Sequence, residues 1–399
     1  MKDLYSLKTS LSAGNMCMKR LEAMGLAAGM LTAGAYLVPR SLIEHQVLPI
    51  SLTLIFVFLA IWRLFYYKLQ KTAHFKSRIV ILGTSEEARK IAEHLQGYHS
   101  LGYEFKGFID DVYDKPPLGM LPPHILGYCA QLQEIVEREH IDKIVVALAD
   151  RRGKLPIETL LACKLHGVEV EEGTTFYEQV CRKIMLENLR PSWLVFSQGF
   201  TIAPPLCILK RLVDLFLTVL VLLLTAPLML IVAILIKLDS AGPVLYRQER
   251  VGRYGKVFAV LKFRSMYHEA EAFTGPIFAD KHDNRITRVG RVLRTMRVDE
   301  LPQLFNVLRG EMSFVGPRPE RPFFVEQFAK NIPYYTQRHS VRPGITGWAQ
   351  VCYPYGATAE DAVEKLCLDL YYIKNMSLGL DLRIITKTLQ IVVCGKGAR

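Results

Sequence analysis

The sequence predicts an α/β membrane protein with two folded domains. Half of the residues are apolar and the mean hydropathy is +0.18. Three apolar segments, at residues 25–38, 48–67 and 215–236, are candidates for membrane contact. Strand and helix patterns alternate between residues 78 and 180, as in a parallel sheet. We divide the chain into N-terminal membrane segments at 1–70, a Rossmann-like doubly wound domain at 78–182, a linker at 183–209, a re-entrant membrane helix at 210–238 and a small α+β domain at 239–399.

The first two apolar segments predict a transmembrane hairpin. Residues 48–67 have the length of about 20 residues that crosses about 30 Å of hydrocarbon, and aromatic residues gather at their end. Lys68 and Lys71 follow directly, and basic residues favour the cytoplasmic side of a membrane. Residues 25–38 are a weaker segment. We therefore expect a short hairpin with both ends in the cytoplasm.

The region from 78 to 182 predicts a nucleotide-binding type of fold without a complete nucleotide fingerprint. An apolar run at residues 78–82 is followed by Gly83, Thr84 and an amphipathic helix. A dinucleotide fingerprint requires three glycines in this turn, and the chain supplies one. We expect an accessory or regulatory module, and leave open whether it binds a nucleotide.

The third apolar segment predicts a helix that enters and leaves the membrane on one face. Residues 215–236 have basic residues on both flanks, which argues against a simple crossing. Pro227 removes a backbone hydrogen bond in mid-segment, so we expect a kink at Ala226 and Pro227 and a helix-break-helix arrangement. An ordinary spanning helix with a tolerated proline is the alternative.

The C-terminal region is the basic part of the chain. Residues 240–399 have 24 Lys+Arg and 15 Asp+Glu, which is 9 of the net charge of +12. A basic domain attracts nucleic acid, anionic lipid head groups or phosphorylated substrates. The eight cysteines show no zinc-site spacing and no disulfide framework. Aromatic and basic residues are not interleaved as in single-strand binders, so we expect no nucleic-acid partner.

Candidate cations are found on a strand and on a helix of this domain. Lys262 and Arg264 alternate in a strand-like run, which predicts that both lie on one face. Arginines recur every three residues from 285 to 297, so they fan around a helix of 3.6 residues per turn. We therefore expect only two or three of them, Arg294 among the candidates, to face one ligand.

Two adjacent carboxylates predict phosphoryl transfer. Asp299 and Glu300 precede Pro302, and taken alone they are explained by helix capping. Their context favours chemistry, because Arg294 precedes them and a rigid segment with Arg318 follows. A carboxylate can attack phosphorus, its neighbour can bind Mg²⁺, and guanidinium groups can neutralise phosphate oxygens.

Two further residues are weaker candidates. Arg342 opens a Pro/Gly-rich loop that ends at Trp348, and a structural turn is at least as good an explanation. Asp381 lies in an apolar run, where a carboxylate is unfavourable without a partner, so we expect a cation or a metal beside it.

Several motifs together resemble a known family. They are Lys210-Arg211 with Asp214, KFRSM at 262–266, DELPQL at 299–304, GPRP at 316–319 and RPGITGWAQV at 342–351. Residues 208–399 resemble the bacterial sugar transferases, which are monotopic polyprenyl-phosphate phosphoglycosyl transferases that start exopolysaccharide and O-antigen synthesis. The chain end and the upstream module resemble the long exopolysaccharide subgroup.

The resemblance implies transfer of a sugar-1-phosphate from a UDP-sugar to undecaprenyl phosphate, with release of UMP. Asp299 would be the nucleophile that forms a covalent phosphosugar ester, Glu300 the Mg²⁺ ligand, and Asp381 a further required acid. The candidate substrate-binding residues are Lys262, Arg264, Arg294, Arg318 and Arg342. The implied location is the bacterial inner membrane, with the catalytic domain facing the cytoplasm and glycosyltransferases acting downstream. A homodimer is left open, and the sugar is not identified.

The chain departs from the family pattern at two places, and two other functions are alternatives to the one that the resemblance implies. Ala226-Pro227 replaces the usual Ser-Pro break, with Thr225 as a substitute hydroxyl, and fewer N-terminal membrane helices are present than in long members. A membrane-bound nucleotide-sugar dehydratase would need the full glycine fingerprint and a Tyr-x-x-x-Lys pair in the 78–180 module. A membrane-anchored scaffold that grips polyanions, including nucleic acid, is disfavoured because the basic domain has neither interleaved aromatic and basic residues nor an obvious recognition helix.

Overall fold

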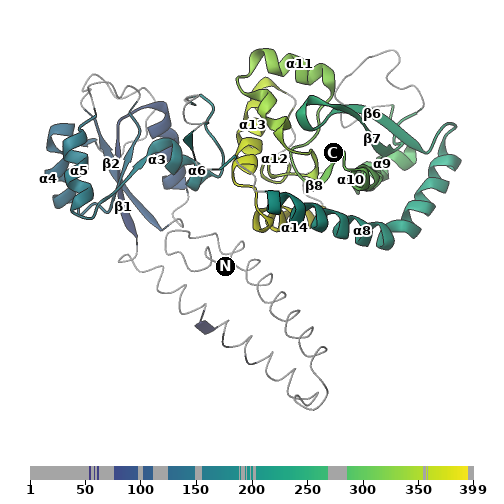
Figure 1. The fold of residues 1–399 in the computed structure, drawn as a ribbon, viewed down its shortest axis with the longest axis horizontal. Coiled ribbons are helices and arrows are strands. Elements are labelled where there is room, and N and C mark those ends of the chain that lie inside the picture. The colour runs from purple at the N-terminus through teal and green to yellow at the C-terminus, as the bar shows by residue number, and fades with distance from the viewer. Residues whose placement is uncertain are drawn as a thin grey trace. The chain divides into compact units, whose positions relative to one another are not determined.

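The computed structural model forms two compact units, Met1–Cys181 and Arg182–Arg399 (Figure 1). The structure describes residues 76–97, 102–110, 125–148, 155–187, 204–267, 285–353 and 358–393, with isolated positions between these ranges. The expected hairpin at 1–70 lies outside the described residues, apart from isolated positions, and stays a prediction.

Unit one contains a parallel five-stranded sheet in the order β3-β2-β1-β4-β5. The strands are β1 Ser77–Leu82, β2 Tyr103–Ile109, β3 Ile125–Gly127, β4 Lys143–Val146 and β5 Glu169–Glu172. The helical elements are α3 Glu86–Gly97, η3 Cys129–Gln131, α4 Leu132–Arg138, α5 Ile157–Leu165 and α6 Gly173–Cys181. Figure 1 shows α4 and α5 on one face of the sheet and α3 and α6 on the other, which confirms the expected parallel α/β architecture of this unit.

The single glycine after β1 is explained by packing. Gly83 has φ +105°, and a Cβ there would lie 2.6 Å from the carbonyl oxygen of Ala147, at the end of β4. Only glycine adopts this conformation without strain. The turn between β1 and α3 is therefore adapted to the neighbouring strand, and this contact alone accounts for the glycine.

Unit two is built on the long helix α8 Pro204–Asp239 and two small sheets. Its strands are β6 Leu245–Val251 and β7 Val257–Phe263, which pair antiparallel, and β8 Ser313–Val315 and β9 Gly344–Thr346, which pair parallel. Its other helices are η4 Arg253–Gly255, α9 Arg288–Thr295, η5 Val298–Glu300, α10 Gln303–Arg309, α11 Pro322–Asn331, η6 Tyr335–Ser340, α12 Trp348–Cys352, α13 Ala359–Lys374 and α14 Leu378–Val393.

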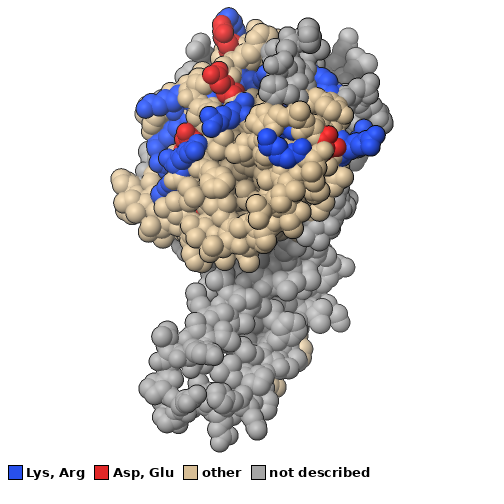
Figure 2. Space-filling model, turned by 90° about the vertical axis from the view of Figure 1, so that its right-hand side faces the viewer, with Lys and Arg blue, Asp and Glu red and all other residues tan. Residues whose placement is uncertain are grey.

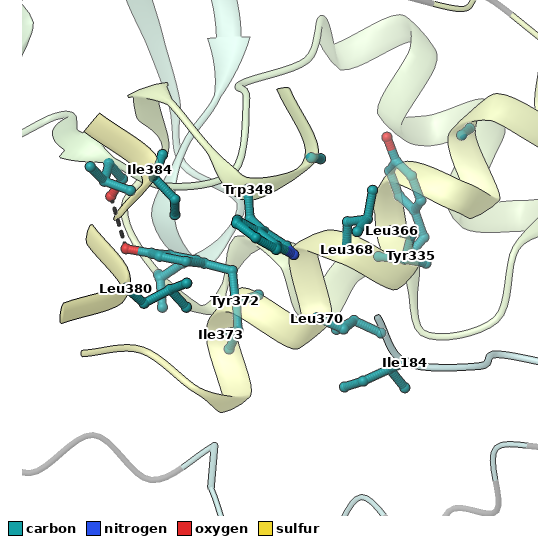
Figure 3. Packing of buried hydrophobic residues seen from close by; sticks show 14 of the residues in the cluster. Ile184, Tyr335, Trp348, Leu366, Leu368, Leu370, Tyr372, Ile373, Leu380 and Ile384 are labelled. Atoms are coloured by element: carbon teal, nitrogen blue, oxygen red, sulfur yellow. Dashed lines mark hydrogen bonds between the residues drawn. The ribbon is translucent and has the colours of Figure 1, made fainter. Parts of the chain in front are cut away.

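The main core of unit two lies between α12, α13, α14 and η6 (Figure 3). Tyr372 is buried there, and its hydroxyl oxygen lies 3.1 Å from the carbonyl oxygen of Val315 in β8. Ile184 and Leu189 are buried in the same core. The segment that we expected to be a linker therefore begins as a structural part of unit two, because its apolar side chains complete this core.

Helix α8 is continuous, so the expected break at Ala226 and Pro227 is wrong. Pro227 lies inside the 36-residue helix, and Figure 1 shows α8 following a curved path. A proline removes one backbone donor, that for the Leu223 carbonyl, and a helix can bend around this loss. The Thr225 hydroxyl donates to the Val221 carbonyl oxygen at 2.7 Å, so it does not replace the missing donor.

Most of α8 exposes apolar side chains. It is the one helix among the described residues that is long and apolar enough to cross a membrane. The side chains that α8 buries are those of Asp214, Thr218, Val232 and Ile236, and the leucines between them are largely exposed. Figure 2 shows one side of the molecule, with a broad surface free of charged side chains below a belt of Lys and Arg.

Both ends of α8 are attached to the same unit. Near its start, Arg211 Nη1 donates to the Val307 carbonyl oxygen of α10 at 2.8 Å. At its end, Asp239 Oδ2 accepts a hydrogen bond of 3.2 Å from the backbone N–H of Val289 in α9. A straight helix of this length would extend about 54 Å. The curvature of α8 thus lets both ends reach one domain.

Candidate active site

The two adjacent carboxylates lie on a short helix between α9 and α10. The preceding residue, Arg297, has φ +55°, so the chain turns sharply just before η5. Asp299 is 9% exposed, and Glu300 is partly buried beside it. Asp299 is therefore buried within a sharp turn, and the N-cap residue of η5 is Arg297 and not one of the carboxylates.

Glu300 is held by two of the predicted cations. Lys262 Nζ from β7 lies 3.4 Å from Glu300 Oε1, and Arg318 Nη2 from the loop after β8 lies 3.1 Å from the same oxygen. Burial by itself raises the pKa of Glu300, but the charges of Arg318 and Lys262 outweigh it and lower the pKa to about 2. Glu300 is therefore ionised at neutral pH.

The pKa of Asp299 is shifted in the opposite direction from that of Glu300. Burial and the negative charge of Glu300 raise the pKa of Asp299 to about 6, against the opposing charges of Lys262, Arg294 and Arg318. Arg294 is thus close enough to Asp299 to affect it. The structure brings together Asp299, Glu300, Lys262, Arg294 and Arg318, and makes Asp299 the more basic of the two carboxylates.

Supporting residues that the sequence did not reveal hold this group in place. The Asn306 side chain in α10 accepts a hydrogen bond from the Leu261 N–H at 3.0 Å and donates one to the Ala259 carbonyl oxygen at 2.8 Å. These bonds attach α10 to β7, the strand that contains Lys262. The local sequence around Asn306 does not predict this role, because its partners are backbone groups that are distant in the sequence.

A buried ion pair supports the Arg318 loop. Arg338 Nη2 donates to the Arg318 carbonyl oxygen at 3.1 Å and to Asp369 Oδ2 at 2.8 Å. Arg250 in β6 donates to the Pro319 carbonyl oxygen at 3.0 Å. The Pro-Arg-Pro segment motif was visible in the sequence, but the arginines that hold it were not.

Arg264 lies away from the carboxylates, contrary to the expectation that it shares a face with Lys262. Strand β7 ends at Phe263, so the alternation does not extend to position 264. The buried Arg264 guanidinium donates to the carbonyl oxygens of Ile236, Ser240 and Ala241, at distances from 2.6 to 3.3 Å. Arg264 therefore satisfies carbonyl groups at and just beyond the C-terminal end of α8.

Arg342 and Asp381 also lie in other surroundings. The charges of Arg211 and Arg253 act on Arg342. Asp381 in α14 accepts from Lys210 Nζ at 2.7 Å and from the Tyr372 hydroxyl at 2.8 Å. The expected cationic partner of Asp381 is thus confirmed as Lys210. The contacts of Asp381 attach α8 to the core, and they do not include Asp299 or Glu300.

Comparison with known proteins agrees with this geometry. The family model for the bacterial sugar transferase matches residues 206–395, which include every residue of the site. The exopolysaccharide production protein PSS of Rhizobium leguminosarum bv. phaseoli is 46% identical over 187 residues, which are 46% of this chain and 94% of that protein. The chain belongs to the bacterial sugar transferase family. A second model, described as a CoA-binding domain, matches residues 2–161.

Longer relatives in the sugar transferase family cover both units in part. The UDP-N-acetylgalactosamine-undecaprenyl-phosphate N-acetylgalactosaminephosphotransferase of Aeromonas hydrophila is 44% identical over 260 residues, 65% of this chain and 60% of that protein. The undecaprenyl-phosphate glucose phosphotransferase of Komagataeibacter xylinus is 34% identical over 334 residues, 82% of this chain and 61% of that protein. The chain thus spans about three fifths of the length of these two relatives.

Proposed function

We propose that this sugar transferase moves a sugar-1-phosphate from a UDP-sugar to undecaprenyl phosphate, the first membrane step of exopolysaccharide or related polysaccharide synthesis. The proposal rests mainly on the buried pair Asp299 and Glu300, whose pKa values are shifted in opposite directions and which lie among basic side chains. The names of the two longer relatives support the substrate class, since both refer to undecaprenyl phosphate. They name different sugars, so the sugar of this chain is left open.

The proposed reaction has two displacement steps. In the first, an Asp299 carboxylate oxygen attacks the phosphorus that carries the sugar, an Asp299–phosphorus bond forms, and the bond to the bridging oxygen breaks with release of UMP. In the second, an oxygen of the lipid phosphate attacks the same phosphorus and frees Asp299. Lys262, Arg294 and Arg318 stabilise the phosphate charges in both steps.

We further propose Mg²⁺ as the cofactor. Mg²⁺ is usually bound by one or two carboxylates together with substrate phosphates, and Glu300, which is ionised, would supply the carboxylate. When bound, the ion would neutralise charge on the donor phosphates. The residues of the chain would orient the phosphates through Lys262 and Arg318 and keep Asp299 sheltered from water.

The proposed location is the inner membrane, with unit two on the cytoplasmic face. The curved α8 supports a re-entrant helix, because both of its ends contact unit two and its exposed surface is apolar. An enzyme held in this way can take a soluble donor from the water and a lipid acceptor from the bilayer.

The test is release of UMP by the detergent-solubilised protein with undecaprenyl phosphate and Mg²⁺ across a panel of UDP-sugars. We expect release from one donor and its loss in Asp299→Asn, because an amide is a far poorer nucleophile. A covalent phosphosugar adduct that persists in Asp299→Asn would contradict the assignment of the nucleophile. Absence of release from every donor, with folded protein and lipid present, would contradict the proposed activity.

A further inference from the structure

Three arginines outside the candidate active site gather at the start of the apolar part of α8. We call Arg211, Arg253 and Arg342 the arginine triplet. Arg211 lies on α8, just before the apolar stretch of residues 215–236. Arg253 lies on η4, between β6 and β7, and Arg342 lies in the loop before β9. Three separate elements therefore contribute one guanidinium each.

Hydrogen bonds fix the backbone around the triplet. Asp214, one turn after Arg211, accepts a bond of 2.7 Å from the Ser313 hydroxyl. The Ser313 N–H donates to the carbonyl oxygen of Pro343 at 2.8 Å, next to Arg342. These contacts place the loop of Arg342 against α8.

Arg253 is attached to the same loop from the other side. Its Nε donates to the Ser340 carbonyl oxygen at 3.3 Å, two residues before Arg342. Arg211 uses Nη1 and Nη2 on the carbonyl oxygens of Val307 and Leu308, at 2.8 and 3.1 Å. A guanidinium has five N–H donors, so both arginines keep donors for a further acceptor.

The positive charge of the triplet is poorly compensated. Burial and the charges of Arg211 and Arg253 lower the pKa of Arg342, and the nearby carboxylate, Asp214, is engaged by Ser313 and by the Phe314 N–H. Among the residues that the structure describes, the Arg342 guanidinium has no hydrogen-bond or ion-pair partner. Three cations with one engaged acid leave an excess of positive charge here, which favours binding of an anion.

The surroundings are those of a membrane surface. Ile208 and Leu212, on either side of Arg211 in α8, are 64% and 59% exposed, and Tyr254 beside Arg253 is 69% exposed. Leu308, whose carbonyl binds Arg211, is 37% exposed. An anion at this place would lie where apolar side chains meet cations, which suits the phosphate of a lipid.

We propose that the arginine triplet binds a phosphate group carried by a membrane lipid. One source is the acceptor polyprenyl phosphate, held beside the active site before it reacts, and this source rests on the proposed function. The other source is the head group of an anionic phospholipid, which would orient the enzyme on the membrane. Both present the same chemistry to three guanidinium groups, a phosphate attached to an apolar tail.

The test is lipid binding by the full chain in nanodiscs of phosphatidylcholine, measured by native mass spectrometry. The parent protein carries Asp299→Asn, so binding is observed without turnover. The probes are undecaprenyl phosphate and phosphatidylglycerol. We expect at least one of them to bind, and Arg342→Gln to weaken that binding about tenfold, because charge-assisted hydrogen bonds are lost. The lipid that responds identifies the source.

Matched variants separate the triplet from general charge effects. Arg309→Gln removes an exposed arginine at the end of α10, outside the triplet, and should bind both lipids as the parent does. Arg342→Lys keeps the charge but loses the planar fork, so its binding should be intermediate. If Arg342→Gln lowers the melting temperature sharply, Arg253→Gln, on a surface turn, takes its place.

Two results would overturn the proposal. One is binding of neither lipid by the parent, and the other is equal binding of both lipids by the parent and Arg342→Gln. Neither result depends on turnover, so failure here is distinguishable from failure of UMP release in the wild-type protein.

Discussion

At the residue scale, Asp299 and Glu300 show how one environment gives two carboxylates different roles. Both are shielded from water, but Glu300 contacts Lys262 and Arg318 directly. For Asp299, burial and the negative charge of Glu300 raise the pKa. The more basic carboxylate is the better nucleophile, and it is deprotonated over most of the neutral range.

The acidity of Asp299 is directly testable. In the metal-free protein, we expect the Asp299 carboxyl to titrate near pH 6, since its pKa is raised to about 6. The ionised fraction rises with pH, so about a tenth is ionised one unit below the midpoint. Glu300→Gln removes a neighbouring negative charge and should shift the midpoint to lower pH. The measurement is ¹³C NMR of labelled aspartate, with Asp299→Asn to assign the signal, and an unchanged midpoint in Glu300→Gln would contradict this coupling.

Asp381 is predicted to act through structure and not through contact with substrate. Lys210→Met would leave Asp381 and Asp214 buried and negative without their shared cation, so we expect a loss of about 3–5 kcal/mol in unfolding free energy. Lys210→Met combined with Asp381→Asn removes one of these charges and should recover part of the loss. Chemical denaturation in detergent measures both, and a double variant no more stable than Lys210→Met would argue against the pair.

The residue scale also shows what sequence reasoning can and cannot find. The motif residues Asp299, Glu300, Lys262 and Arg318 could be predicted, because chemistry restricts the residue types that serve it. The role of Arg264 could not be predicted, because its partners are carbonyl groups at the end of α8. The sequence pattern also does not show that β7 ends at Phe263, one residue before Arg264. Supporting residues such as Asn306 are likewise defined by backbone contacts far away in the chain.

At the element scale, α8 shows why a proline does not determine a break. The sequence identified the apolar stretch, the basic flanks and Pro227, and each is present in the helix. The helix is continuous through Pro227, and its two ends contact α10 and α9. Such contacts between distant elements are not encoded in the local pattern.

The topology of α8 is tested by cysteine labelling. Single cysteines at Glu158, before α8, and at Lys256, after it, are both at exposed positions. In inverted and right-side-out vesicles, on a background without other cysteines, a membrane-impermeant maleimide should label both from the cytoplasmic side, because a re-entrant helix keeps its two flanks together. Labelling from opposite sides would favour a spanning helix.

At the scale of the whole molecule, the site belongs entirely to unit two. The chain entering that unit is already structural at its first residues, since the Trp348 indole N–H donates to the Arg182 carbonyl at 3.0 Å and Ile184 is 1% exposed. Unit one supplies none of the described residues around Asp299. The sequence placed the start of unit two too late, because burial of a short apolar run cannot be read without its partners.

Truncation can locate the start of the functional unit. A chain that begins at Arg182 should fold and release UMP, whereas one that begins at Pro204 loses Ile184 and Leu189 from the core. Each buried side chain of this kind contributes about 1.5–3 kcal/mol, so the shorter chain should melt at a lower temperature. Differential scanning fluorimetry of the two proteins in the same detergent makes the comparison, and equal melting temperatures would contradict it.

The pairing of Glu300 with Lys262 and Arg318 also bears on ionic strength. Glu300 already compensates part of the positive charge of Lys262 and Arg318. A UDP-sugar that binds to these two cations therefore displaces fewer dissolved anions, because a protein carboxylate has taken their place. The arginine triplet has one carboxylate nearby, Asp214, which already accepts hydrogen bonds from Ser313 and the Phe314 N–H. Raising the salt concentration from dilute buffer to physiological strength should therefore weaken binding of a lipid phosphate at the triplet far more than binding of the nucleotide sugar beside Glu300.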